Sequence, residues 1–152
     1  MTDIDLGVLL GLAYQRFKDE LHADLAAHGF ADVGSAYGYV FRALAAEELS
    51  QHDLAVRLGI SDQGMAKIVT EMVRRRYVER RADAADARVK RLRLSARGRR
   101  ALAAARRFHA HFERRLVRNT NARSAATLRR LLHAMSASEE SSDLAQARLR
   151  LL

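Results

Sequence analysis

The chain contains no cysteine, proline or tryptophan among its 152 residues. The absence of cysteine excludes a disulfide framework, a cysteine-ligated zinc site and a thiol redox switch. No apolar run approaches the ~18 residues that a membrane-spanning helix needs. Acidic residues, Asp3 and Asp5, precede the first apolar stretch, which is not the pattern of a signal peptide. We therefore expect a cytoplasmic domain with no membrane partner.

What is abundant is arginine, and its placement is uneven. Residues 1–49 carry a net charge of −5, residues 50–118 a net charge of +12, and residues 119–152 a net charge of +2. A basic middle segment of this kind favours a face that binds a polyanion. The alternative is a chain that places arginine on solvated faces, since 24 of its 27 basic residues are arginine.

Helical periodicity runs through most of the chain. Apolar residues recur every three or four positions over 6–25, which predicts a long amphipathic helix ending near Gly29. A second helix is expected over 37–44, capped by Asp32 or Ser35. Further helices are predicted from Ser95 to Asn119 and around 128–135, followed by a break at 136–142 and a short helical tail at 144–152.

Residues 50–73 have the pattern of a helix-turn-helix. Ser50 is placed to cap a short helix, Gly59 to end it in the left-handed conformation, and Ser61 to cap a longer second helix. A plain helical hairpin within a bundle is the alternative. The basic hairpin that follows favours DNA recognition by the second helix.

That hairpin is predicted from an extended run at Tyr77, a turn at 83–86 and a half-exposed strand over 88–94. Its basic side chains suit contacts along a DNA backbone and into the minor groove, with an aspartate of the turn orienting Arg88. The alternative is a solvated hairpin whose charges only oppose aggregation.

We expect eleven residues of these two motifs to contact DNA. Gln63 is suited to reading adenine edges, and Lys67 to reaching a phosphate. The full set is Ser50, Gln51, Ser61, Asp62, Gln63, Gly64, Lys67, Thr70, Arg74, Arg88 and Lys90.

The sequence at 49–61, LSQHDLAVRLGIS, resembles the first half of the winged helix of the MarR family. The sequences YVER at 77–80, DAADAR at 83–88 and LSARG at 94–98 resemble that family's wing and the helix after it. The resemblance implies a mainly α fold with a small β-hairpin wing, and N- and C-terminal dimerisation helices. It also implies a homodimeric regulator of transcription, usually a repressor relieved by a small anionic or phenolic ligand.

Three positions depart from the family pattern. Gly64 is expected to weaken the recognition helix, because glycine has low helix propensity. Arg76 stands where a glycine is usual, so the end of that helix is expected to be strained or shifted. Ala84 replaces a common wing proline, which leaves the wing tip more mobile.

We divide the chain into a winged helix-turn-helix at 35–95 and a helical dimerisation region at 1–34 and 96–152. The terminal helices carry apolar stripes beyond the needs of one winged helix, and we expect a second copy to cover them and the dimer to bind a pseudopalindromic operator. Packing of these helices within one chain is the alternative. The stripes comprise Leu6, Leu10, Phe17, Phe112, Leu116, Leu128, Leu131, Leu132 and Leu144.

By analogy with the family, an effector cleft would lie between the dimer helices and the winged helix, with Arg16, His22 or Arg42 meeting an anion. Its expected lining is Tyr14, Phe17, Tyr37, Phe41 and Arg42. Aromatic residues at helical spacing are also typical of a core.

No metal, cofactor or catalytic site is predicted. His109 and His111 lie two apart on a helix, about 200° around its axis, so they cannot hold one metal ion together. No nucleophile-and-base arrangement or phosphate-binding glycine loop is present. The alternative to a DNA-binding regulator is a winged-helix module that binds RNA or a protein partner.

Overall fold

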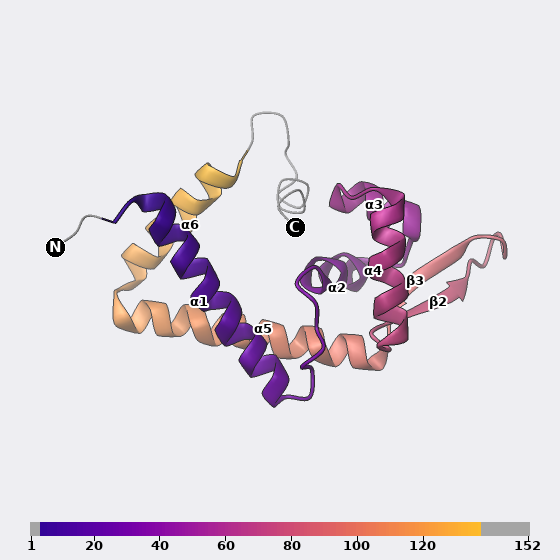
Figure 1. Cartoon of the computed structure of the whole chain (residues 1–152), viewed down its shortest axis with the longest axis horizontal. Helices are drawn as coiled ribbons and strands as arrows, with labels where there is room; N and C mark the ends of the chain where they lie inside the picture. The colour runs from indigo at the N-terminus through magenta and orange to yellow at the C-terminus, as the bar shows by residue number, and fades with distance from the viewer. Residues whose placement is uncertain (1–3, 138–152) are drawn as a thin grey trace. The chain divides into compact units, whose positions relative to one another are not determined.

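A computed structural model describes residues 4–137 of the chain (Figure 1). The chain divides into two units, 1–33 and 34–152. The described part of the first unit is dominated by α1 (Leu6–Ala27). As predicted, α1 ends at a left-handed glycine: Gly29 has φ +87°, and the N–H of Phe30 bonds to the carbonyl of Leu25 at 2.9 Å. The tail predicted at 144–152 lies outside the described residues.

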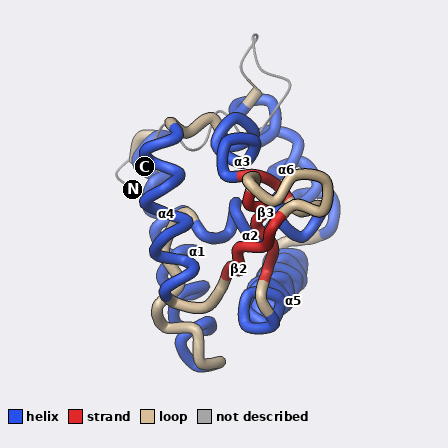
Figure 2. The backbone as a smooth tube through the Cα atoms, turned by 90° about the vertical axis from the view of Figure 1, so that its right-hand side faces the viewer, coloured by secondary structure: helices blue, strands red, loops and turns tan. Residues whose placement is uncertain are grey.

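The second unit is mainly helical and contains one small antiparallel sheet of strand order β1-β3-β2 (Figure 2). Leu92 of β3 pairs with Leu49 on one side and Arg80 on the other. The wing hairpin is as predicted, whereas the pairing of β1 was not predicted. The elements in chain order are α2 (Tyr37–Ala46), β1 (Leu49–Ser50), α3 (Gln51–Leu58), α4 (Asp62–Arg74), β2 (Val78–Ala82), β3 (Lys90–Leu94), α5 (Ala96–Asn119) and α6 (Ala122–Ser136).

The start of α2 differs from the prediction. Its N-cap is Ala36, and no side chain caps it, so neither Asp32 nor Ser35 takes that role. The N–H of Tyr37 instead bonds to the carbonyl of Gly34 at 3.1 Å, in a turn that leads into the helix. Burial of the apolar face of α2 therefore fixes this helix without a side-chain cap.

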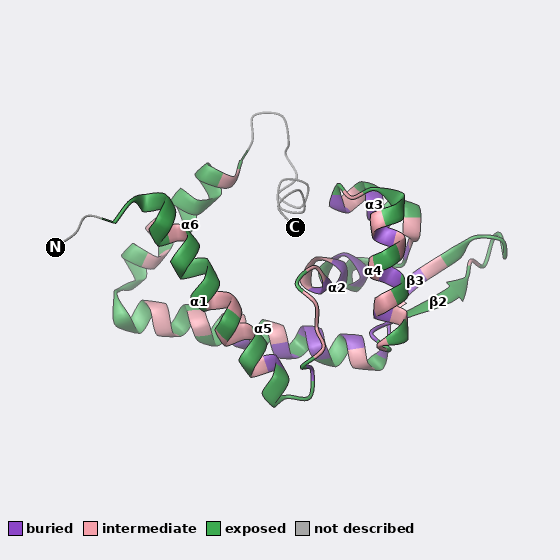
Figure 3. Ribbon diagram, viewed as in Figure 1, coloured by how far each residue is buried: buried purple, intermediate pink, exposed green. Residues whose placement is uncertain are grey.

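The core of the second unit gathers around three aromatic rings. Tyr37 and Phe41 of α2 lie 5.8 and 5.6 Å from the ring of Tyr77, in edge-on or tilted arrangements. Met65 and Met72 of α4 are fully buried as well. The buried residues concentrate in α2, α3, α4, the base of the sheet and the first half of α5 (Figure 3). This core holds the two helices of the helix-turn-helix and the wing in fixed relation.

The helix α6 has a different character. None of its residues is buried, and its large apolar side chains are exposed (Figure 3). They are Leu128, Leu131, Leu132 and Met135. Across residues 4–137, no helix combines the length and hydropathy that crossing a membrane requires.

Candidate nucleic-acid interface

The helix-turn-helix is built as the sequence predicts. Ser50 Oγ accepts the N–H of Asp53 at 3.1 Å and caps α3. Gly59 ends α3 with φ +65°, and the N–H of Ile60 bonds back to the carbonyl of Ala55 at 3.0 Å. These local bonds set the turn and thereby the direction in which α4 leaves it.

At the start of α4, Ser61 Oγ accepts the N–H of Gly64 at 3.1 Å. A Cβ on Gly64 would lie 2.9 Å from Ile60 Cγ2 and 3.1 Å from Ser61 Oγ. The glycine therefore makes room for the turn to pack against the first turn of the helix, and α4 runs through it without a break. Because glycine has a low helix propensity, this close packing comes at the expense of some helix stability.

One face of α4 is a polar stripe. Gln63, Lys67, Thr70 and Arg74 follow one another at spacings of four, three and four residues, and all are exposed. Within the described part of the chain, Gln63, Lys67 and Arg74 make no side-chain hydrogen bond or ion pair, and Thr70 Oγ1 lies 3.5 Å from a guanidinium nitrogen of Arg80. This stripe is therefore available to a ligand outside the chain.

Several of the predicted contact residues use their side chains locally, among them Ser50 and Ser61. The hydroxyl oxygens of Ser50 and Ser61 are both acceptors of cap hydrogen bonds, which leaves each hydroxyl hydrogen to donate elsewhere. Gln51, next to Ser50, is partly exposed. A DNA contact by any of the three remains a prediction.

The tip of the wing is organised by Asp83. Its carboxylate accepts the Nε–H of Arg91 at 2.5 Å and the backbone N–H groups of Ala85 and Asp86 at 2.8 and 3.2 Å. The bond from Arg91, followed by those from the two amides, lowers the pKa of Asp83 below its ordinary value. The carboxylate thus stays charged at neutral pH, and its stabilisation of the tip is lost only as the pH falls through that lowered pKa.

The expected role of an aspartate in orienting the Arg88 guanidinium is wrong. Asp86 Oδ1 accepts the backbone N–H of Arg88 at 3.0 Å, and Asp83 binds Arg91 instead. A backbone amide close in sequence is reached with less loss of side-chain entropy than a guanidinium. Within the described residues the guanidinium of Arg88 therefore has no partner and projects from an exposed position.

The wing's basic side chains fall into two groups. Arg91 and Arg93 are in ion pairs with Asp83 and Glu79, so their charges are largely offset. The exposed cations of the wing that form no ion pair with any residue of 4–137 are Arg80, Arg81, Arg88 and Lys90. The latter group supplies the basic surface beside the polar stripe of α4.

The base of the wing is held by Ser95. Its Oγ–H donates to the carbonyl of Arg76 at 2.6 Å, with the carbonyl of Tyr77 at 3.1 Å, and its oxygen accepts the N–H of Gly98 at 2.9 Å. Arg76 has φ +63°, as expected of a residue that stands at a glycine position. The sequence predicts the strain at Arg76, but not the cap by Ser95 or the connection of the two through one buried hydroxyl.

A pair that the sequence analysis missed joins the two helices. His52 Nδ1 lies 2.9 Å from Asp62 Oδ1 across the turn. The hydrogen bond and the negative charge of Asp62 raise the pKa of His52 above its ordinary value. The ten-residue separation gives no periodic signal, so only the folded turn brings the two side chains together.

The residues predicted for an effector site have varied surroundings. Tyr37 and Phe41 are 3% and 2% exposed in the aromatic core, while Tyr14 and Phe17 lie on α1 in the first unit. Arg42 donates to the carbonyl of Gly38 at 3.2 Å and lies 3.3 Å from His109 Nε2. Burial, followed by the charge of Arg42, lowers the pKa of His109. The effector site remains a prediction.

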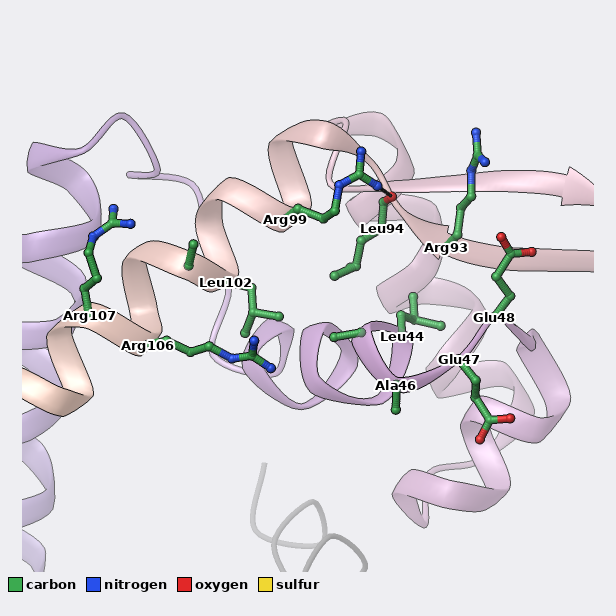
Figure 4. A pocket seen from close by; sticks show the side chains of 12 residues that line it. Leu44, Ala46, Glu47, Glu48, Arg93, Leu94, Arg99, Leu102, Arg106 and Arg107 are labelled. Carbon is green, nitrogen blue, oxygen red and sulfur yellow. Dashed lines mark hydrogen bonds between the residues drawn. The ribbon is translucent and has the colours of Figure 1, made fainter.

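A groove of about 670 Å³ opens between the end of α2, the end of β3 and the first half of α5 (Figure 4). Arg99, Arg106 and Arg107 line one side, and Glu47 and Glu48 line the other. Arg99 donates to the carbonyl of Leu94 at 2.9 Å. None of the five residues predicted for the effector site lines this groove. Among the described residues, no cluster of three or more histidine, aspartate or glutamate side chains could hold a metal ion.

Comparison with known proteins places the chain among winged helices. Residues 31–89 match the MarR family, which confirms the resemblance found in the sequence. A search of curated proteins gives no match.

Three solved structures show the fold. CouR, a transcriptional repressor bound to a 23-mer DNA duplex, is 24% identical with a TM-score of 0.69, covering 88% of this chain and 93% of its own. Reduced MarR from E. coli is 21% identical with a TM-score of 0.68, covering 90% and 100%. A MepR mutant from S. aureus, bound to an oligodeoxyribonucleotide, is 20% identical with a TM-score of 0.62, covering 88% and 96%.

Proposed function

We propose that this chain, which matches the MarR family over residues 31–89, is a homodimeric repressor of transcription that binds duplex DNA and is relieved by a small ligand. The role is that of a binding protein and not of an enzyme. CouR and MepR, whose fold it shares, were solved with DNA bound. A cytoplasmic location follows from this role, because the protein acts where the genome is.

The observation that carries the proposal is the polar stripe of α4 beside the unpaired cations of the wing. Lys67 and Arg74 on α4 and Arg88 and Lys90 on the wing are exposed, and their charges are not offset by ion pairs within the described residues. A helix flanked by a basic hairpin matches the major groove and the adjacent backbone or minor groove of duplex DNA. We assign base contacts to the first turn of α4 and phosphate contacts to the cations.

The dimer is part of the proposal. Leu128, Leu131 and Met135 on α6 are 42%, 53% and 60% exposed, and Leu6 and Leu12 on α1 are 65% and 59% exposed. Apolar stripes of this size are stabilised when a second copy covers them. We therefore assign 1–34 and 96–152 to dimerisation and 35–95 to DNA binding, although the first half of α5 also contributes to the winged-helix core.

An effector is expected to be a small phenolic or anionic molecule. There are two candidate binding sites for this effector. One is the set of residues predicted from the sequence, which includes Arg42, and the other is the arginine-lined groove of Figure 4, which includes Arg106. Thermal stabilisation by salicylate as a probe distinguishes them, since only the variant at the true site, Arg42→Ala or Arg106→Ala, loses the shift.

The decisive experiment is selection of bound fragments from genomic DNA, followed by footprinting. A twofold-related pair of protected half-sites is expected. Affinity for the selected duplex is then compared between the wild type and the variant Lys67→Ala/Arg74→Ala. The variant Arg123→Ala/Arg130→Ala removes the same charge from α6 and serves as the control.

We expect the α4 variant to lose at least about tenfold in affinity and the control to bind like the wild type. Preference for RNA or for a protein, with no selected duplex, would support the alternative interaction module. A monomeric, fully DNA-competent protein after deletion of 120–152 would contradict the assigned dimer.

A further inference from the structure

His52 occupies a particular place in the helix-turn-helix. It lies in the first turn of α3, and its partner Asp62 is the first residue of α4, so the pair sits where the N-terminal ends of both helices meet. The side chains are 69% and 67% exposed. Helix N-termini favour anions because their N–H groups point outward. In a helix-turn-helix, the first helix crosses the DNA backbone and the second enters the groove.

The hydrogen bond decides what the imidazole can offer to a ligand. A carboxylate only accepts hydrogen bonds, so Nδ1 of His52 donates to Asp62 whether the ring is neutral or charged. Nε2 is the remaining nitrogen, and it has no partner among the described residues. In the neutral ring Nε2 is a bare acceptor, which repels a phosphate oxygen. In the protonated ring it is an N–H donor, which binds one.

The surrounding charges act in one direction. Asp62 from α4 favours the protonated imidazole through its hydrogen bond and its charge, and this outweighs the opposing effect of burial; Asp53 from α3 itself adds a smaller effect in the same direction. Of the other elements packed against α3, β3 brings Arg91, whose guanidinium binds Asp83.

The loop after α2 brings Glu47, whose carboxylate binds Arg57 of α3. β1, the remaining neighbour of α3, carries no charged residue. The unpaired cations Lys67 and Lys90 belong to α4 and β3, but only the carboxylates of Asp62 and Asp53 act through their charge on the pKa of His52.

We propose that the protonated imidazole of His52, oriented by Asp62, donates its Nε2–H to a phosphate of the bound DNA. This adds a backbone contact that requires a proton, so operator affinity falls as the pH rises through the titration of His52. The proposal rests on the proposed DNA-binding function. Asp62, which the sequence analysis expects to contact DNA, is here assigned a positioning role instead, because its carboxylate fixes the ring and would repel a phosphate.

The test is operator affinity measured by fluorescence anisotropy between about pH 5.5 and about pH 8.5 at several salt concentrations. Four proteins are compared: the wild type, His52→Gln, Asp62→Asn, and His133→Gln as an exposed histidine control on α6. The wild type and the control are expected to bind several-fold more tightly at the acid end, with a salt slope larger there by about one per half-site. His52→Gln loses both effects.

Asp62→Asn separates orientation from charge. Removal of a negative charge beside DNA would by itself strengthen binding at every pH. We also expect the gain in affinity at acid pH to move to lower pH, because the amide oxygen can still accept the Nδ1–H but carries no negative charge to favour the protonated imidazole. Titration of the His52 ring protons by NMR without DNA is expected to show the same displacement.

The outcomes are distinguishable. If the wild type binds the operator but His52→Gln keeps the same pH profile and salt slope, the inference is overturned and the proposed function stands. If no duplex binds at any pH, both fail. If Asp62→Asn leaves the NMR titration of His52 unchanged, the part of the inference in which the charge of Asp62 favours the protonated ring is overturned, even where DNA binds.

Discussion

The Cα atom of Gly98 lies so close to the backbone of Tyr77 that a Cβ built on it would stand 2.2 Å from the Tyr77 carbonyl oxygen. The contact joins the first turn of α5 to the residue that precedes β2. Ser95 ties the same two segments together, because its hydroxyl lies within hydrogen-bond distance of Tyr77 O and its backbone N–H donates to that oxygen at 3.0 Å. The wing therefore departs from α4 and returns to α5 through one tightly packed junction.

Gly98→Ala is expected to destabilise the protein by roughly 3 kcal/mol, because the obstructing atom is backbone and cannot rotate away. Urea unfolding followed by circular dichroism measures the change. Gly38→Ala in α2 is the matched control, since its added Cβ would meet only the flexible end of Arg42 at 3.4 Å. Equal stability of the two variants would contradict the close approach.

Arg76→Gly is expected to stabilise the protein by about 0.5–1 kcal/mol. An L-residue in the left-handed region is strained by roughly 1–2 kcal/mol, and the greater freedom of glycine in the unfolded chain offsets part of the relief. The bond from Ser95 is kept, because it goes to the carbonyl of residue 76. Arg75→Gly, one residue earlier at φ −83°, should destabilise instead. Urea unfolding of both variants tests the opposite signs.

Gln63 and Lys67 are expected to contribute to DNA binding in different ways. Gln63 lies in the first turn of α4, where side chains meet base edges, so Gln63→Ala should relax base preference at one position of each half-site by ~1–3 kcal/mol. Lys67 lies one turn further along the same exposed stripe, and Lys67→Ala should weaken all sequences alike. Binding-site selection with each variant measures this, and an unchanged preference for Gln63→Ala would count against the placement.

Arg88→Ala is expected to weaken operator binding and to reduce the magnitude of the salt slope by about one to two per dimer. The guanidinium is free to enter the minor groove, where the negative potential is strongest when the groove is narrow. Folding should be unaffected, since Asp86 holds the backbone N–H of residue 88 and that bond survives the substitution. Arg123→Ala on α6 controls for the loss of one charge. If Arg88→Ala keeps the operator affinity and the salt slope of the wild type, Arg88 makes no DNA contact and only shapes the turn.

Much of the fold follows from the sequence because its signals are local. Ser50, Ser61 and Ser95 each accept the N–H of the residue three positions on, and this cap is legible in a few consecutive letters. The same holds for the left-handed ends at Gly29 and Gly59. The polar stripe of α4 could also be predicted, because the period of a helix alone decides which of its residues share a face.

Only the tertiary structure decided the rest. Strand β1 has only two residues, which is too few to show the alternation of a strand in the sequence. These residues form a strand only because they pair with β3, about forty residues later in the chain. Which wing cations are offset depends on the register of β2 and β3 and on the geometry of the tip, not on their number in the sequence. The space at Gly64 and Gly98, and the pairing of His52 with Asp62, exist only once separate segments are packed together. Composition and periodicity thus determine the elements and the character of the surface, while the partners of individual side chains depend on contacts between segments that no local pattern encodes.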